Sequence, residues 1–339
     1  MQTLGGFPAP ASRRVSSARH NATRSWCRSA ANEASAWLRP AGASRRAAAT
    51  GVWVLHWPVG HVGRGFAGRT GGGGAAAGRA LVPWRIAPRV YCLGPSGRAG
   101  TNVFFVRSAT SWTLVDTGWA SDADRIERAA AALLGGDTRP DAILLTHCHP
   151  DHSGAAERLA RDWDCPVHLP AEEVPIAIGD FAAMVADAGP LDRWVVLPML
   201  RALGRRRREA VLARSRLDCS LRAFRPGTDV PGMPGWECVP TPGHTRGHVS
   251  YSRPADGVLI TGDAVVTLRV NSPAGLLLSR EGISGPPWYT TWDRRLARES
   301  VARLADLEPS VLACGHGTPM TGPDTAEALR ALAERLGGH

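Results

Sequence analysis

The chain is 339 residues long, which suits one large domain or two ordinary ones. Its formal net charge of +10 arises entirely in residues 1–80, which contain eleven Arg and one acid, while the remainder is balanced and gives no basic patch typical of a nucleic-acid-binding domain. The seven Cys include no C-x-x-C pair, so no disulfide framework is expected and a cytoplasmic location is predicted. No apolar run reaches about 18 residues, so no transmembrane helix is expected.

Residues 1–80 are rich in Arg, Ala, Gly and Ser, have little apolar periodicity, and are expected to form a largely disordered leader. Their one apolar stretch, at 52–59, is too short to span a membrane. The Arg-rich, acid-poor composition is typical of an organellar transit peptide and also suits a nucleic-acid-binding arm. A third interpretation, which we favour, is that translation begins near Val82.

From Val90 onward, short apolar runs and amphipathic segments predict alternating strands and helices. The runs at 103–106 and 112–115 predict two strands joined by a turn, and an Ala-rich helix is predicted at 122–134. The sequence AILL at 142–145 predicts a strand buried on both faces. Pro150 suits the first turn of a helix over 151–162.

The second half of the chain continues this alternation. Residues 172–216 predict two or three helices, with a break at Gly189-Pro190. The remaining predicted elements are strands at 221–224, 236–239, 249–251, 258–260 and 311–313, and helices at 294–307 and 324–336. Strands and helices interleave, with hairpin-like pairs among them, which favours a mixed α/β layered domain.

The segment THCHPDHSG, residues 146–154, places His147, His149, Asp151 and His152 within six consecutive positions. Ordinary packing gives no reason to crowd so many titratable groups, whereas imidazole and carboxylate are good ligands for zinc and other divalent metals. His147 lies at the carboxyl end of a predicted buried strand, the edge at which α/β sheets tend to place their ligands. The segment therefore indicates a metal site.

Four further candidates lie where other predicted strands break into Gly-containing loops. They are Asp116 in VDTG, His244 in TPGHTRGH, Asp263 in TGDA and His316 in GHGTP. Because packing alone does not explain a His or Asp at each of these strand ends, we group them with the first cluster.

The motifs VDTG, THCHPDH, TPGHTRGH, TGDA and GHGTP, in this order, resemble those of the metallo-β-lactamase-fold hydrolase superfamily. The motifs are specific for the fold and the metal site and much less so for the substrate. The resemblance implies an α/β fold, a four-layer αββα sandwich, with a two-metal site at one sheet edge. The implied catalytic domain covers residues 81–339 and carries a helical insertion at about 172–216.

The resemblance also implies a role for each candidate residue. The first metal would be bound by His147, His149 and His244, the second by Asp151, His152 and His316, with Asp263 bridging the two. Asp116 would hold the ligand loop in place. His248, four residues after His244, is expected to make a structural hydrogen bond rather than to bind metal, with substrate contact as an alternative. Cys148 is expected to point away from its ligating neighbours, because side chains alternate in an extended segment.

The implied cofactors are two divalent ions, expected to be Zn²⁺, with Fe or Mn as alternatives. They would lower the pKa of a shared water toward about 7. The resulting metal-bridged hydroxide would attack an ester, lactone or thioester carbonyl, and Asp151 and Asp263 would be the catalytic carboxylates. The alternative within the same fold is an iron-dependent persulfide dioxygenase. The alternative of another class is a nucleic-acid-binding protein that uses the Arg-rich leader.

Three aromatic residues, Trp288, Tyr289 and Trp292, cluster between the Asp263 and His316 motifs. They suit core packing and also an apolar substrate wall, so we take them as candidate substrate-binding residues. The expected partner is a small-molecule substrate; neither a membrane nor a nucleic acid is expected, and the sequence carries no signal for an oligomeric state.

Overall fold

The computed structural model describes residues 82–97, 100–136, 138–213, 215–218, 221–227 and 229–338, all within one compact unit, Arg69–His339. The prediction for residues 1–80 lies outside the described residues. In the described part of the chain, none of the helices has the length and apolar character needed to cross a membrane.

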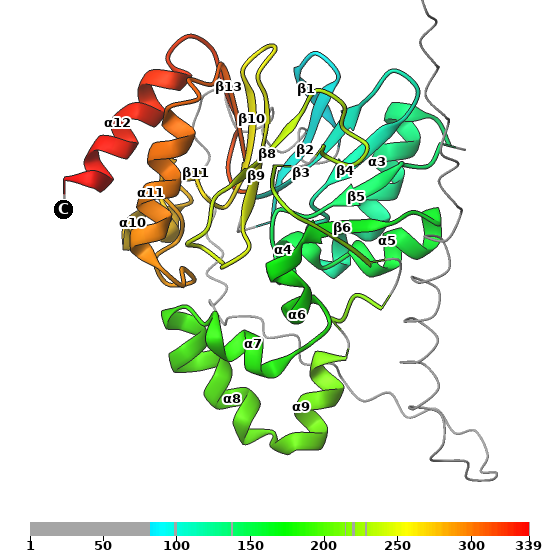
Figure 1. The fold of residues 1–339 in the computed structure, drawn as a ribbon, viewed down its shortest axis with the longest axis vertical. Coiled ribbons are helices and arrows are strands. Elements are labelled where there is room, and N and C mark those ends of the chain that lie inside the picture. Colours follow the sequence, from blue (N-terminus) through cyan, green and yellow to red (C-terminus); the bar gives the residue numbers. More distant parts are fainter. Residues whose placement is uncertain are drawn as a thin grey trace, which may run out of the picture. The chain divides into compact units, whose positions relative to one another are not determined.

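Two large β-sheets lie next to each other in the middle of this unit (Figure 1). The strands are β1 Trp84–Ala87, β2 Val90–Ser96, β3 Thr101–Arg107, β4 Trp112–Val115, β5 Ala142–Leu144, β6 Val167–Pro170, β7 Leu221–Phe224, β8 Glu237–Pro240, β9 Val249–Arg253, β10 Val258–Gly262, β11 Val266–Leu268, β12 Glu281–Ser284, β13 Val311–Cys314 and β14 Met320–Thr321. The seven-stranded sheet follows the order β1 to β7, and the five-stranded sheet has the order β14-β13-β10-β9-β8. Strands β11 and β12 pair separately.

The helices of the described residues include those that cover the outer faces of the two sheets and those of the insertion. They are α3 Ala123–Leu134, α4 Pro150–Ser153, α5 Ala156–Trp163, α6 Val174–Ala177, α7 Phe181–Ala186, α8 Leu197–Ala202, α9 Gly204–Leu212, α10 Pro273–Leu278, α11 Arg294–Ala305 and α12 Thr325–Gly337. In Figure 1, α3 and α5 lie beside the seven-stranded sheet, and α11 and α12 lie beside the five-stranded sheet. Helices α7 to α9 form a separate group next to α6.

Strand β3 shows how the seven-stranded sheet separates two hydrophobic cores. Val103 and Phe105 pack with Ile126 of α3 and with α5, whereas Phe104 and Val106 pack in the core between the two sheets. Successive side chains of a strand point to opposite faces, so a continuous apolar run buries both faces.

Strand β10 does the same for the five-stranded sheet. Leu259 packs with Val301 of α11 and with α12, while Val258 and Ile260 join the core between the sheets. The order of layers is therefore helix, sheet, sheet, helix, and the predicted αββα sandwich is confirmed.

The single helix predicted at 151–162 is wrong, because the segment divides into α4 and α5 at Gly154. The Gly154 N–H donates to the carbonyl of Gly118, 3.0 Å away, and a Cβ at Gly154 would lie 2.5 Å from the backbone nitrogen of Ala120. The chain thus breaks where it packs against the loop that follows β4, a contact between distant segments.

The helical insertion has more and shorter pieces than predicted. It contains α6 to α9 together with a π-helical turn at Asp192–Val196, and Gly189-Pro190 does separate α7 from this turn. A Cβ at Gly189 would lie 2.6 Å from the carbonyl carbon of Thr290, so this break also marks a close approach between distant segments.

Candidate metal centre

The predicted ligands follow the carboxyl ends of strands in both sheets. The loop with His147, His149, Asp151 and His152 follows β5, and His244, Asp263 and His316 follow β8, β10 and β13. Because β10 and β13 run parallel to each other, their loops open at the same edge. A Cβ at Gly315 would lie 2.6 Å from Oδ1 of Asp263, so glycine is needed there for the loop to pass close to the site.

The structure brings all seven predicted ligands into three overlapping groups. In each group the potential ligand atoms lie within 4.8 Å of one another. The groups are His147, His149 and His244; His147, His152 and Asp263; and Asp151, His152 and His316. Their assignment as metal ligands stays a prediction, since proximity alone does not identify an ion.

Asp263 lies between the two outer groups, and each of its carboxylate oxygens faces a different one. Its Oδ2 lies 3.3 Å from Nε2 of His244, and its Oδ1 lies 3.3 Å from Nε2 of both His152 and His316. Asp151 completes the second group, with Oδ2 3.3 Å from Nε2 of His316. This is the placement that a bridging carboxylate requires.

The buried imidazoles are suited to receive a metal. Nε2 of His147 and both ring nitrogens of His244 are buried without a hydrogen-bond partner among the described residues. Burial lowers the pKa of both side chains well below the usual value, which keeps them in the neutral form that binds metal.

The carboxylates add negative charge that a cation would balance. Burial opposes the charged form of His152 and His316, yet Asp263 and the neighbouring acids raise the pKa of His152 well above its usual value and that of His316 to about 10. The acids therefore require positive charge at this point, and a divalent cation supplies it. Unpartnered neutral imidazoles beside charged carboxylates fit the metals that the fold implies.

Asp116 forms hydrogen bonds with two residues of the ligand loop. Its Oδ1 accepts from the backbone N–H of Thr146 at 2.8 Å, and its Oδ2 lies 2.9 Å from Nδ1 of His152. The Thr146 hydroxyl also contacts Asp116, and it lies 3.0 Å from Nδ1 of His147. A proton on Nδ1 of His152 that points at Asp116 leaves Nε2 free to coordinate.

His248 is held in a hydrogen-bonded position. Its Nε2 accepts from the backbone N–H of Asp263 at 3.0 Å, and its Nδ1 lies 2.8 Å from the hydroxyl of Thr241. Burial lowers the pKa of His248 to about 3, so the ring stays neutral. The side chain therefore contacts the backbone of Asp263, and its structural role stays a prediction.

Sequence reasoning missed Glu173, which joins two ligand loops. Its fully buried carboxylate accepts from the backbone N–H of Cys148 at 2.9 Å, from the hydroxyl of Thr245 at 2.6 Å and from the backbone N–H of Gly247 at 2.9 Å. Burial raises the pKa of this carboxyl. Nothing in the local sequence separates Glu173 from the exposed Glu172, so no signal was available to find it.

Two cavities adjoin the centre. One, of about 350 Å³, is lined by Asp151, Asp263, His316 and Tyr289, and we call it the metal-side cavity. The other, of about 360 Å³, lies under the helical insertion and is called the insertion cavity.

Of the three aromatic candidates, Tyr289 lines the metal-side cavity. Trp288 is about half exposed, Trp292 packs against the guanidinium of Arg246, and neither lines these two cavities. Cys148 lines the insertion cavity and belongs to none of the ligand groups found among the described residues.

The fold and the site define an αββα protein with clustered His and Asp at one edge of its two sheets. Residues 96–316 match the model of the metallo-beta-lactamase superfamily, and the chain belongs to this family. The probable metallo-hydrolase YflN of Bacillus subtilis is 36% identical over 242 residues, which are 69% of this chain and 87% of that protein. The probable metallo-hydrolase YybB of the same bacterium is 26% identical over 220 residues, 65% of this chain and 82% of that protein.

A solved structure supports the same relationship. The metallo-beta-lactamase family protein TTHA1429 from Thermus thermophilus is similar, with a TM-score of 0.53 and 25% identity over 75% of this chain and 80% of that one. Family membership and these relatives support a metal-dependent hydrolase, and they leave the substrate class open.

Proposed function

We propose that the protein is a dinuclear zinc hydrolase that cleaves an ester, lactone or thioester. The observation that carries the proposal is the position of Asp263, whose two oxygens face different groups of histidines. A carboxylate placed in this way would offer one oxygen to each of two ions. When bound, a pair of divalent ions polarises a carbonyl and makes a water molecule acidic enough to lose a proton at neutral pH.

The residues of the chain then have separate tasks. His147, His149 and His244 would hold one ion, and Asp151, His152 and His316 would hold the other. Asp263 keeps the two halves together, and the hydrogen bond from its backbone to His248 fixes its orientation. Asp151 lines the metal-side cavity, so its carboxylate can orient a water molecule for attack.

Tyr289 is the group best suited to assist the substrate. It lines the metal-side cavity, and burial together with Asp263 and Asp151 raises the pKa of its phenol, which therefore keeps its proton. A phenol O–H in this position can donate to the carbonyl oxygen as negative charge develops on it. Leu268, Val270 and Leu191 line the same cavity and limit the access of water to the reacting groups.

The test is metal analysis of the purified full chain, followed by a panel of lactones, thioesters, aryl esters, phosphodiesters and β-lactams. We expect about two zinc ions per chain and turnover of carbonyl esters or thioesters. A metal-loaded protein that turns over none of the carbonyl substrates would contradict the proposal. A single iron with thiol-dependent oxygen uptake would replace it with a persulfide dioxygenase.

A further inference from the structure

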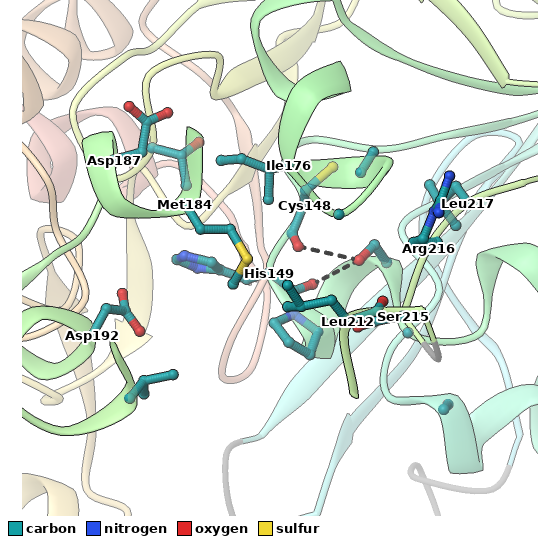
Figure 2. Close-up of a pocket in the computed structure, with 18 of the residues that line it drawn as sticks. Cys148, His149, Ile176, Met184, Asp187, Asp192, Leu212, Ser215, Arg216 and Leu217 are labelled. Carbon is teal, nitrogen blue, oxygen red and sulfur yellow. Dashed lines mark hydrogen bonds between the residues drawn. The ribbon is translucent and has the colours of Figure 1, made fainter. Parts of the chain in front are cut away.

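The insertion cavity lies beside the metal centre, and His149 is the one proposed ligand that lines it. Helices of the insertion contribute Ile176, Met184, Leu197 and Leu212 to its wall, and the ligand loop contributes His149. In Figure 2 the side chain of Met184 extends toward His149. The cavity volume of about 360 Å³ lies within the range of small-molecule sites.

The insertion cavity and the metal-side cavity share part of their walls. Trp119, His149, Pro150 and Asp192 line both of them. His149 is only half buried, whereas His147 and His244 are buried, so its imidazole lies at the boundary between the two spaces. A substrate whose reacting carbonyl lies in the metal-side cavity can therefore extend past His149 into the insertion cavity.

The chemistry of the wall selects what can occupy this space. Most of the lining surface is apolar, and Ile176, Val196 and Leu217 contribute to it. Two of the charged residues that line it form ion pairs: Asp187 pairs with Arg246 at 2.8 Å, and Arg216 lies 3.4 Å from Asp218. A further carboxylate, Asp192, lies on the wall shared with the metal-side cavity. Glu157 accepts from the backbone N–H of Asp218 at 2.9 Å. Beyond the shared wall, a polar substituent among these apolar side chains would lose its hydration without gaining a partner, so this part of the cavity favours an apolar substituent.

We propose that the insertion cavity binds an unbranched aliphatic acyl chain attached to the scissile carbonyl. This inference rests on the proposed hydrolase function and deepens it. The preferred substrates are then esters, lactones or thioesters of medium-chain fatty acids, and the helical insertion sets the preference.

A chain-length series tests the proposal on the metal-loaded full chain. With p-nitrophenyl esters from acetate to dodecanoate, kcat/KM should rise about three- to fourfold for each added methylene until the cavity is full. Met184→Trp places a larger side chain in the cavity and should lower the ratio of decanoate-ester to acetate-ester kcat/KM at least tenfold. Met199→Trp is the matched control, because Met199 is about half exposed, lines neither cavity and should leave this ratio unchanged.

Calorimetric titration with decanoic acid gives a second readout that does not depend on turnover. Wild type should bind it at least ten times more tightly than Met184→Trp; if that variant does not fold, Leu212→Trp takes its place. Turnover with no dependence on chain length, or equal decanoate binding by wild type and variant, overturns the inference and leaves the proposed function standing. Decanoate binding that the variant weakens, without turnover of any ester, lactone or thioester, overturns the proposed function instead.

Discussion

Asp263 joins the two halves of the candidate metal centre, because its two oxygens face different histidines. We predict that Asp263→Ala or His147→Ala reduces bound metal and abolishes turnover while the fold survives. Elemental analysis, circular dichroism and ester turnover measure the three effects. Asp256→Ala, at an exposed carboxylate paired with Arg253, is the control and should behave as wild type. Wild-type turnover in either site variant would reject the site.

Asp116 contacts Thr146 and His152, so any effect on bound metal would be exerted through these residues. We predict that Asp116→Asn lowers kcat/KM about 10- to 100-fold, the loss typical of groups that orient metal ligands. Asparagine is preferable to alanine, because Asp116 has a φ of 58° and Asn tolerates this conformation. An activity loss as large as that of Asp263→Ala would mean that Asp116 has a direct role.

Glu173 is a buried carboxylate that hydrogen-bonds both the His147–His149 loop and the His244 loop. All three of its partners are donors, so Glu173→Gln turns at least one acceptor into a donor that faces another donor. We predict a 10- to 100-fold weaker metal affinity, measured by competition with a chromogenic chelator. Glu172→Gln removes the same charge from an exposed neighbour and should leave the affinity unchanged. Equal affinities in the two variants would show that Glu173 does not position the ligands.

The difference between these residues shows what the sequence could predict at the site. His147 to His152 and the Gly-flanked His244, Asp263 and His316 are recognisable because each lies in a short motif at a strand end. Glu173 contacts partners 25, 72 and 74 residues away, so its role depends on tertiary structure. A short stretch of sequence around Glu173 therefore does not reveal these contacts.

At the scale of elements, helix α11 holds the loop of His244 in place. The backbone N–H groups of Asp293 and Trp292 donate to the carbonyls of Gly243 and His244, at 2.9 and 3.1 Å. Gly243 has a φ of +134°, and a Cβ there would lie 2.2 Å from the backbone nitrogen of Ala297. Only glycine allows the loop to approach the helix this closely.

We therefore predict that Gly243→Ala displaces the loop, lowers the free energy of unfolding by about 1–3 kcal/mol and reduces bound metal. Urea denaturation and elemental analysis measure the two effects. Gly136→Ala is the control, since Gly136 is exposed and a Cβ there meets nothing within 4 Å. If Gly243→Ala keeps its metal and stability, the close packing of α11 on this loop is not needed for the site.

The same kind of contact explains where the prediction of elements failed. Strands β3, β4, β5, β7, β8, β9, β10 and β13 and helices α3, α11 and α12 were predicted from apolar patterns in the local sequence. The break between α4 and α5 depends on the approach of Gly154 to the loop after β4, and the division of the insertion involves contact between Gly189 and Thr290. Neither contact is visible in a window of ten residues.

At the scale of the whole molecule, the apolar runs predicted burial but not the partners of each face. Strands β3 and β10 read as continuous apolar segments, which indicates that both of their faces are covered. The order of layers came from the resemblance of five motifs to a known family. The hydrophobic pattern alone was compatible with other arrangements of the same strands and helices.

The three hydrophobic cores found in the described residues consist of side chains between Ile86 and Leu332, so we expect residues 1–80 to be dispensable. A variant that begins at Leu81 should unfold cooperatively at the temperature of the full chain and bind the same amount of metal. It loses eleven Arg and one acid, so its formal charge falls from +10 to zero. Limited proteolysis of the full chain should stop near Arg79 to Arg89.

The truncation also distinguishes the proposed hydrolase from a protein that acts through an Arg-rich nucleic-acid-binding arm. The hydrolase requires equal kcat/KM in the full chain and in the variant from Leu81, because every proposed ligand lies between His147 and His316. An arm that binds nucleic acid requires RNA affinity in the full chain that falls steeply as salt rises and disappears in the variant. Hydrolysis lost on truncation, together with such RNA binding, would show that residues 1–80 carry the function.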